Sequence, residues 1–365
     1  MASGNSFGDI YRVTTYGESH GGGLGVIIDG CPAGLELSMK KIRHEMNRRK
    51  PGQSDVTTQR KEADEALISS GVLHTSRDGI VKTMGHPIHL YVLNKDADPS
   101  KYFPIKHNFR PGHADYTYWA KYGTRDWRGG GRSSGRETVG RVLGGAVAKQ
   151  VLEKYCPDLQ ILGCTVNVGG VEAVLRDYGY AESNKIRCPD KNVFDAMMEK
   201  VDYAKKNHDS VGGAVEVVAK QVPAGLGEPV FDKLNAVLMH ALGSIGAVKA
   251  VQIGAGINVE NALGYGYRDA KEWQDEKMIY HTNNAGGIEG GISTGEDIVI
   301  RLSVKPTPTA TGVPLLMPTE DGENEEKVIE GRHDPTIMPR MVPVAEAMTA
   351  IVLTDFLLKQ RAYRE

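Results

Sequence analysis

The chain repeats part of its own sequence at a distance of 191 residues. Residues 21–35 and 212–226 share seven identities in fifteen positions, and both copies end in Pro-Ala-Gly-Leu. An apolar stretch precedes this turn in each copy, and the pattern after it predicts helices from about Ser38, a typical N-cap residue type, to Arg49 and from about Phe231 to Leu242. Chance convergence of two strand–turn–helix units is the alternative. We favour duplication, which predicts one pseudo-symmetric domain over residues 1–365, with repeats near 21–50 and 212–242.

Strand and helix patterns are mixed along the rest of the chain, which indicates an α+β class. Ile298 to Val304 has the composition of a strand that ends before Pro306. Val342 to Arg361 is expected to form a long helix whose apolar stripe packs in the core, with a subunit contact as the alternative. Residues 320–330 carry six acids against one lysine, which is typical of a solvated loop.

The bulk composition excludes a general attraction to anions. With 44 Lys and Arg against 46 Asp and Glu, the formal net charge is −2, so an anion site must come from local clustering. The four cysteines form no CxxC pair, which indicates reduced, cytosolic thiols and no zinc ribbon. Residues 1–10 show no signal peptide, and no apolar run approaches the roughly 18 residues of a membrane span. We expect a cytoplasmic protein without a metal site.

Residues 17–21 read Gly-Glu-Ser-His-Gly, which satisfies the G-x-S-x-G pattern of α/β-hydrolases. That motif needs several strands upstream to form the sheet that it crowns, and only 18 residues precede Ser19. A glycine-rich turn with an incidental histidine is one alternative. The other is a loop that approaches a ligand closely and presents Ser19 and His20 to it.

The segment 106–141 concentrates positive charge. Eight basic residues face three acids there, and 129–135 read Gly-Gly-Gly-Arg-Ser-Ser-Gly. Glycine backbone N–H groups, serine hydroxyls and arginine are the donors that phosphate prefers. An RNA-binding loop is the alternative, because the segment also contains five Tyr and Trp residues.

Weaker signals lie elsewhere in the chain. Arg48 and Arg49 end a predicted helix, where cations complement the helix dipole. Lys305 to Thr309 offers a lysine and two hydroxyls after a strand, and 331–335 read Gly-Arg-His-Asp-Pro. Neither the P-loop pattern nor the G-x-G-x-x-G fingerprint is present, so the common nucleotide-binding folds are not expected.

Together these segments resemble the chorismate synthase family along nearly the whole chain. The resemblance rests on residues 11–21, on Arg-Pro-Gly-His-Ala-Asp-Tyr-Thr at 110–117, on Gly-Gly-Gly-Arg-Ser-Ser-Gly-Arg-Glu at 129–137, and on the blocks at 222–232, 283–288 and 331–335. It implies a β-α-β sandwich, reduced FMN as cofactor and a homotetramer. The implied reaction is the anti-1,4-elimination of phosphate from 5-enolpyruvylshikimate 3-phosphate, which gives chorismate.

The resemblance also implies roles for individual residues. His20 resembles the acid that protonates the departing phosphate, and His113 resembles the group beside N1 of the flavin. Ser19 and Asp334 resemble a relay near flavin N5 that assists removal of the C6 proton. The implied substrate ligands are Arg48, Arg49 and Arg136. The implied FMN contacts are Arg132, Ser133, Ser134, Gly246, Ala247, Gly290, Lys305, Pro306, Thr307, Pro308, Thr309 and Arg332.

Two positions depart from the family pattern. Gly246 stands where many members have asparagine, so one flavin contact is expected to be missing. Asp55 stands where many bacterial relatives have a cation, which argues against an NADPH contact. The sequence shows no additional reductase-like segment, so we expect an external flavin reductase, with NADPH at most an indirect reductant. We expect no nucleic-acid or membrane partner. An RNA-binding protein and a serine hydrolase are the alternative functions.

Overall fold

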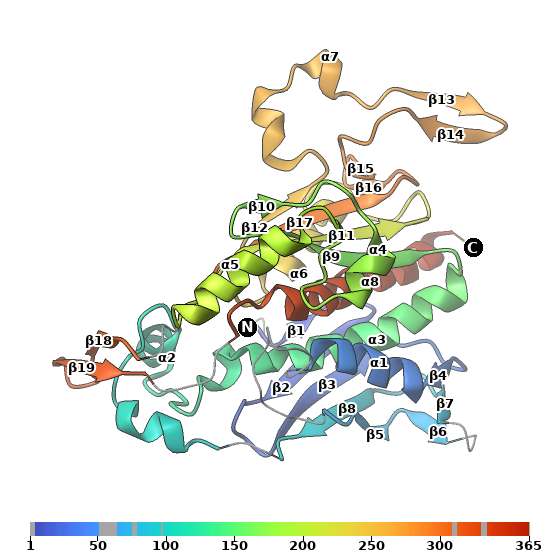
Figure 1. Cartoon of the computed structure of the whole chain (residues 1–365). Coiled ribbons are helices and arrows are strands. Elements are labelled where there is room, and N and C mark those ends of the chain that lie inside the picture. Colours follow the sequence, from blue (N-terminus) through green and yellow to red (C-terminus); the bar gives the residue numbers. More distant parts are fainter. Residues whose placement is uncertain are drawn as a thin grey trace.

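The computed structural model describes residues 4–50, 64–74, 79–95, 98–308, 312–329 and 334–364. Two antiparallel sheets of five strands enclose a layer of helices, which gives the α+β sandwich expected from the sequence (Figure 1). The first sheet has the order β1 (Ser6–Phe7), β2 (Arg12–Gly17), β3 (Gly23–Asp29), β8 (Ile88–Leu93), β5 (Leu67–Ser70). The second has the order β10 (Val171–Glu172), β9 (Gln160–Val168), β11 (Gly213–Lys220), β17 (Ile298–Val304), β12 (Val248–Ile253).

Four helices fill the space between the sheets: α1 (Met39–Arg49), α3 (Thr138–Tyr155), α6 (Leu234–Gly243) and α8 (Met338–Tyr363). Helix α3 packs on β3, α8 packs on β9 and β11, and the two helices pack against each other (Figure 1). The other helices are α2 (Asp115–Tyr122), α4 (Tyr178–Ser183), α5 (Phe194–Lys206) and α7 (Gly264–Tyr267), with 3-10 turns η1 (Ser100–Ile105), η2 (Gly131–Ser133), η3 (Gly135–Glu137) and η4 (Gly256–Asn261).

The remaining strands form small sheets at the periphery. They are β4 (Glu36–Ser38) with β7 (Ile80–Thr83) and β6 (Val72–His74), and the hairpins β13 (Lys271–Gln274) with β14 (Lys277–Tyr280), β15 (Ile288–Glu289) with β16 (Ile292–Ser293), and β18 (Pro314–Pro318) with β19 (Asn324–Val328). The strand predicted at 298–304 is confirmed as β17. The loop prediction at 320–330 is wrong in part, because residues 324–328 pair with β18.

The two echoed segments occupy equivalent places in the fold. Strands β3 and β11 each lie at the centre of a five-stranded sheet, and each leads through its Pro-Ala-Gly-Leu turn to a helix. The first predicted helix is confirmed, since α1 begins after Ser38, whose side chain accepts from the Lys41 N–H at 3.4 Å. The second begins three residues later than predicted. Lys233 has a ψ of 139°, an extended conformation outside the helical region, so the helix begins only at Leu234.

Helix α8 lies mostly in the interior, since nineteen of its 26 residues are buried. Its 26 residues are long and apolar enough to cross a membrane by length and composition, which corrects the expectation that no segment reaches that length. However, 94% of its apolar window is buried inside the protein. The helix therefore forms the core between the two sheets.

Helices α3 and α8 approach each other closely at Gly145. A Cβ added there would lie 2.3 Å from Ala347 Cβ and 2.5 Å from Ala347 Cα, so the neighbouring backbone would have to move. We expect Gly145→Ala to lower the free energy of unfolding by about 1–3 kcal/mol, measured by denaturant titration. Gly266→Ala on α7, where a Cβ meets nothing within 4 Å, is the control and is expected to be neutral or slightly stabilising. Equal effects of the two changes would contradict this packing.

Candidate active site

An arginine-rich cavity of about 680 Å³ opens where the segment 110–138 meets the end of α1 and the start of α8. Among the described residues that line it, seven side chains are cationic, two are carboxylates and one is a histidine, His113. The cations are Arg49, Arg110, Arg132, Arg136, Arg141, Lys305 and Arg340, and the carboxylates are Glu137 and Asp334. This excess suits a ligand that carries several anionic groups.

Gly112 allows two distant segments to meet beside His113. Its φ is +72°, and an added Cβ would lie 2.5 Å from Pro308 Cβ. Lys305 Nζ donates to the Gly112 carbonyl at 3.0 Å. The loop before α2 and the segment that follows β17 therefore pack together. Residues 305–308, which the resemblance implies as FMN contacts, line the cavity.

Gly129 allows the backbone of its loop to approach the His20 ring closely. Its φ is +71°, and an added Cβ would lie 2.6 Å from His20 Cε1. The His20 ring also packs edge-on against Tyr102, with the ring centres 5.4 Å apart. Both Gly129 and Tyr102 line the cavity, whereas His20 lies behind them. Access of His20 to a ligand thus depends on the loop that contains Gly129.

Ser19 lies in the turn between β2 and β3, so no helix follows it and the hydrolase geometry is absent from this turn. Its hydroxyl lies 3.0 Å from His20 Nδ1 and 3.3 Å from the Arg128 carbonyl. Asp334 pairs instead with Arg340, at 2.6 Å. The described contacts of Ser19 are thus with His20 and Arg128, and that of Asp334 is with Arg340, so the relay of Ser19 and Asp334 near the flavin stays a prediction.

The Arg-Ser-Ser segment forms one wall of the cavity. Arg132 donates to Thr15 Oγ1 at 2.7 Å and to the Gly17 carbonyl at 3.2 Å, which fixes its guanidinium against β2. Ser133 donates to the Gly130 carbonyl at 2.8 Å, and Ser134 caps η3. Backbone and hydroxyl groups of 132–134 are thus held at the cavity surface.

Adjacent arginines at the end of α1 have different surroundings. Arg49 lines the cavity and is only 1% exposed. Its Nε donates to Thr138 Oγ1 at 3.1 Å and its NH2 to the Gly135 carbonyl at 2.9 Å. Arg48 is not among the described residues that line the cavity and binds carboxylates, so its role as a substrate ligand stays a prediction that this geometry does not support.

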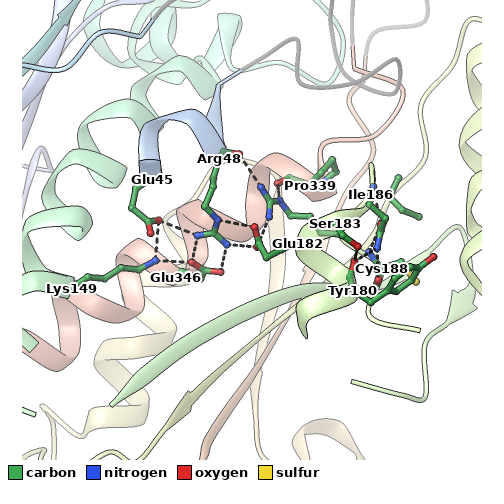
Figure 2. A network of polar contacts seen from close by, with 12 residues as sticks. Glu45, Arg48, Lys149, Tyr180, Glu182, Ser183, Ile186, Cys188, Pro339 and Glu346 are labelled. Carbon is green, nitrogen blue, oxygen red and sulfur yellow. Dashed lines mark hydrogen bonds and ion pairs between the residues drawn. The ribbon is translucent and has the colours of Figure 1, made fainter. Parts of the chain in front are cut away.

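Figure 2 shows the charge cluster that holds Arg48. Both oxygens of Glu346, on α8, accept from Arg48, at 2.5 and 2.8 Å, and Lys149 of α3 lies 2.7 Å from the same carboxylate. Glu45 and Glu182 also accept from Arg48. Burial opposes ionisation of Glu346, but the charges and hydrogen bonds of Lys149 and Arg48 outweigh it and lower its pKa to about 2. The cluster joins α1, α3, α4 and α8.

Of the other predicted cofactor residues, some line the cavity and some do not. Gly246 and Ala247 line the cavity, and the Ala247 carbonyl accepts from the Lys305 N–H at 2.9 Å. Gly290 lies in the turn between β15 and β16 and does not line the cavity. Thr309, Arg332 and Asp55 lie outside the described residues.

Three cationic cavity residues, Arg110, Arg141 and Arg340, were given no site role from the sequence. Arg110 donates through Nε and NH2 to Asp115 at 2.8 and 2.9 Å. Burial would raise the pKa of Asp115, but the hydrogen bonds and charge of Arg110 outweigh it and lower the pKa. The five-residue spacing of this Arg–Asp pair was a signal that could have been used. No nearby sequence pattern marks Arg340, because its position at the cavity depends on how α8 packs in the fold.

A family model described as Chorismate synthase matches residues 11–358. The chain belongs to the chorismate synthase family. It is 49% identical to the chorismate synthase of Methanococcoides burtonii over 98% of this chain and 96% of the relative. It is also 49% identical to that of Roseiflexus castenholzii, over 99% of each. A solved structure titled Crystal Structure of Chorismate Synthase is 32% identical and covers 97% of this chain and 93% of its own, with a TM-score of 0.76.

Family membership confirms three predictions from the sequence. The chain has the chorismate synthase fold and is a carbon–oxygen lyase that acts on a phosphate. Its reaction is the elimination of phosphate from 5-enolpyruvylshikimate 3-phosphate to give chorismate, in the shikimate pathway of aromatic amino acid biosynthesis.

Proposed function

We propose that this cavity binds reduced FMN and 5-enolpyruvylshikimate 3-phosphate together and performs the elimination there. The observation that carries the proposal is the convergence of seven cations and His113 on one cavity. The substrate has a phosphate and two carboxylates, and FMN adds another phosphate. Each of these anions can be matched by an arginine, a lysine or a serine of the lining.

The cavity residues suit a flat, phosphorylated cofactor. The volume of about 680 Å³ lies within the range of small-molecule sites. At Gly246 an added Cβ would meet nothing within 4 Å, so a ring system can approach the backbone there. We propose FMN contacts from the following residues: Arg132, Ser133, Ser134, Gly246, Ala247 and Lys305 to Pro308. From the resemblance we add Gly290, Thr309 and Arg332.

Reduced flavin, when bound, supplies an electron to the substrate and recovers it, so no net oxidation occurs. The chain must then orient the substrate and move protons. We propose that His20 protonates the departing phosphate and that Ser19 positions its ring through the 3.0 Å contact with Nδ1. His113 acts beside the flavin. Asp334, oriented by Arg340, assists removal of the C6 proton.

Arg49 and Arg136 are the proposed substrate ligands. We expect Arg49→Ala to raise KM for 5-enolpyruvylshikimate 3-phosphate by roughly 10–100-fold, because charge-assisted hydrogen bonds contribute about 1.5–3 kcal/mol. The change in kcat should be much smaller, since the guanidinium anchors charge and transfers no proton. Steady-state kinetics under anaerobic conditions measure both values. An unchanged KM would remove Arg49 from the substrate site.

We also propose that the chain acts as one duplicated domain within a homotetramer in the cytoplasm, and that an external reductase supplies the reduced flavin. The four cysteines are all free, which suits a reducing compartment. Anaerobic titration with reduced FMN tests the cofactor directly. We expect saturable binding of one flavin per chain, weakened at least roughly tenfold in Arg132→Ala. Absence of saturable binding to the folded protein would overturn the FMN proposal.

A further inference from the structure

A buried carboxylate behind the cavity joins the two proposed substrate ligands. The side chain of Asp64 is 1% exposed and is not among the described residues that line the cavity. Its Oδ2 accepts from Arg49 NH1 at 3.2 Å, and its Oδ1 accepts from Arg136 NH1 at 2.5 Å. One carboxylate therefore connects the last turn of α1 to the segment that precedes α3.

Other fixed groups hold the same two guanidinium planes. Arg49 also donates to Thr138 and to the Gly135 carbonyl. Arg136 donates through Nε and NH2 to Asn94 Oδ1, at 3.3 and 3.2 Å. A guanidinium held at several nitrogens keeps one orientation, which matters because it recognises a carboxylate or phosphate through a planar fork.

The backbone at Asp64 adopts a left-handed conformation, with a φ of 44°. Among residues other than glycine, aspartate is one of those that visit this region most often. The conformation is compatible with the two ion pairs of its carboxylate. Asp64 also leaves the pair of arginines with one net positive charge, so the fork still attracts an anion.

We propose that Asp64 is a positioning residue that fixes Arg49 and Arg136 as a preformed fork for an anionic group of the substrate. This inference rests on the proposed function of the cavity. Without the carboxylate, both arginines keep their charge but lose their common orientation. The site then binds the shaped organic anion less well, while it still attracts a small inorganic anion.

The test compares Asp64→Asn with Glu216→Gln, which removes another buried carboxylate from its arginine partner, Arg176, on the second sheet. Anaerobic assays give kcat, KM for 5-enolpyruvylshikimate 3-phosphate and the inhibition constant of inorganic phosphate. We expect Asp64→Asn to raise KM at least roughly tenfold, with a phosphate inhibition constant that is unchanged or lower. Glu216→Gln should leave both constants unchanged. If Asp64→Asn leaves KM unchanged, or raises both constants together, the proposal is overturned.

Asp64→Glu covers the case in which the asparagine variant does not fold. It keeps the charge and displaces the carboxylate by one methylene, so a positioning role predicts a raised KM with an unaltered melting temperature. An unchanged KM would again overturn the proposal. If the unsubstituted protein shows no turnover, the proposed function fails. Calorimetric titration with the same substrate then tests Asp64 alone, through roughly tenfold weaker binding by Asp64→Asn, and equal affinities would reject it.

Discussion

Glu346→Gln is expected to lower the free energy of unfolding by about 3–5 kcal/mol, measured by denaturant titration at neutral pH. The carboxylate is 2% exposed and accepts from Arg48 and Lys149. Glutamine has nearly the same shape but no charge, so both cations lose their shared buried partner. Because the cluster joins α1, α3 and α8 between the sheets and ties α4 to them, the loss acts on the centre of the fold (Figure 2).

A matched control separates this effect from the loss of any ion pair. Glu153 pairs with Lys41 at 2.6 Å, but both side chains are more than half exposed. Glu153→Gln should therefore change the free energy of unfolding by less than about 1 kcal/mol. If the two variants lower the free energy of unfolding by similar amounts, burial of the cluster contributes nothing to stability.

The same carboxylate gives a pH dependence with a defined sign. The pKa of Glu346 is lowered from 4.5 to about 2 in the folded protein. Its contribution of about 3 kcal/mol is therefore fully present above the unfolded pKa of 4.5 and is lost as the pH falls through 2. Over this acidic range the unsubstituted protein should lose more stability than Glu346→Gln.

His113→Ala is expected to lower kcat by roughly 10²–10⁴-fold while FMN still binds, because proton-transfer groups contribute effects of this size. His113 lines the cavity, in the loop that Gly112 packs against Pro308. His20 lies next to Gly129 and is not among the described lining residues. For His20→Ala we expect kcat to fall at least roughly tenfold. Anaerobic turnover and flavin titration measure the two properties separately.

His44→Ala is the control for these histidine variants, since His44 is exposed on α1 and outside the cavity. Its turnover should match that of the unsubstituted protein. Wild-type turnover in His113→Ala or His20→Ala would remove that residue from the mechanism. Loss of flavin binding together with turnover would indicate a role in cofactor binding instead.

The architecture was predictable where the pattern was local. The echoed turn at 32–35 and 223–226 indicated two equivalent units, and the strand at 298–304 and the cap at Ser38 were each encoded by their own residues. The acidic stretch at 320–330 was not predictable in this way. Residues 324–328 form β19 because the hairpin docks on a distant segment, where the Phe109 N–H donates to the Pro318 carbonyl at 2.7 Å.

The candidate site shows the same division. Contiguous blocks such as 132–134 and 305–308 were located from the sequence, and the structure brings them to one cavity. The different surroundings of Arg48 and Arg49 were not predictable. Adjacent residues on a helix point about 100° apart, and only the packing of α1 decides which of them faces the cavity. Asp64 escaped notice for a related reason, because its partners lie 15 and 72 residues away.

The central claim is that this cavity eliminates phosphate with the help of reduced FMN. The most direct test is an anaerobic mixture of the purified protein, dithionite-reduced FMN in catalytic amount and 5-enolpyruvylshikimate 3-phosphate, in which phosphate and chorismate are followed together. We expect equal amounts of the two products over many turnovers per flavin. If the folded, flavin-bound protein forms neither product, the account of this cavity is contradicted.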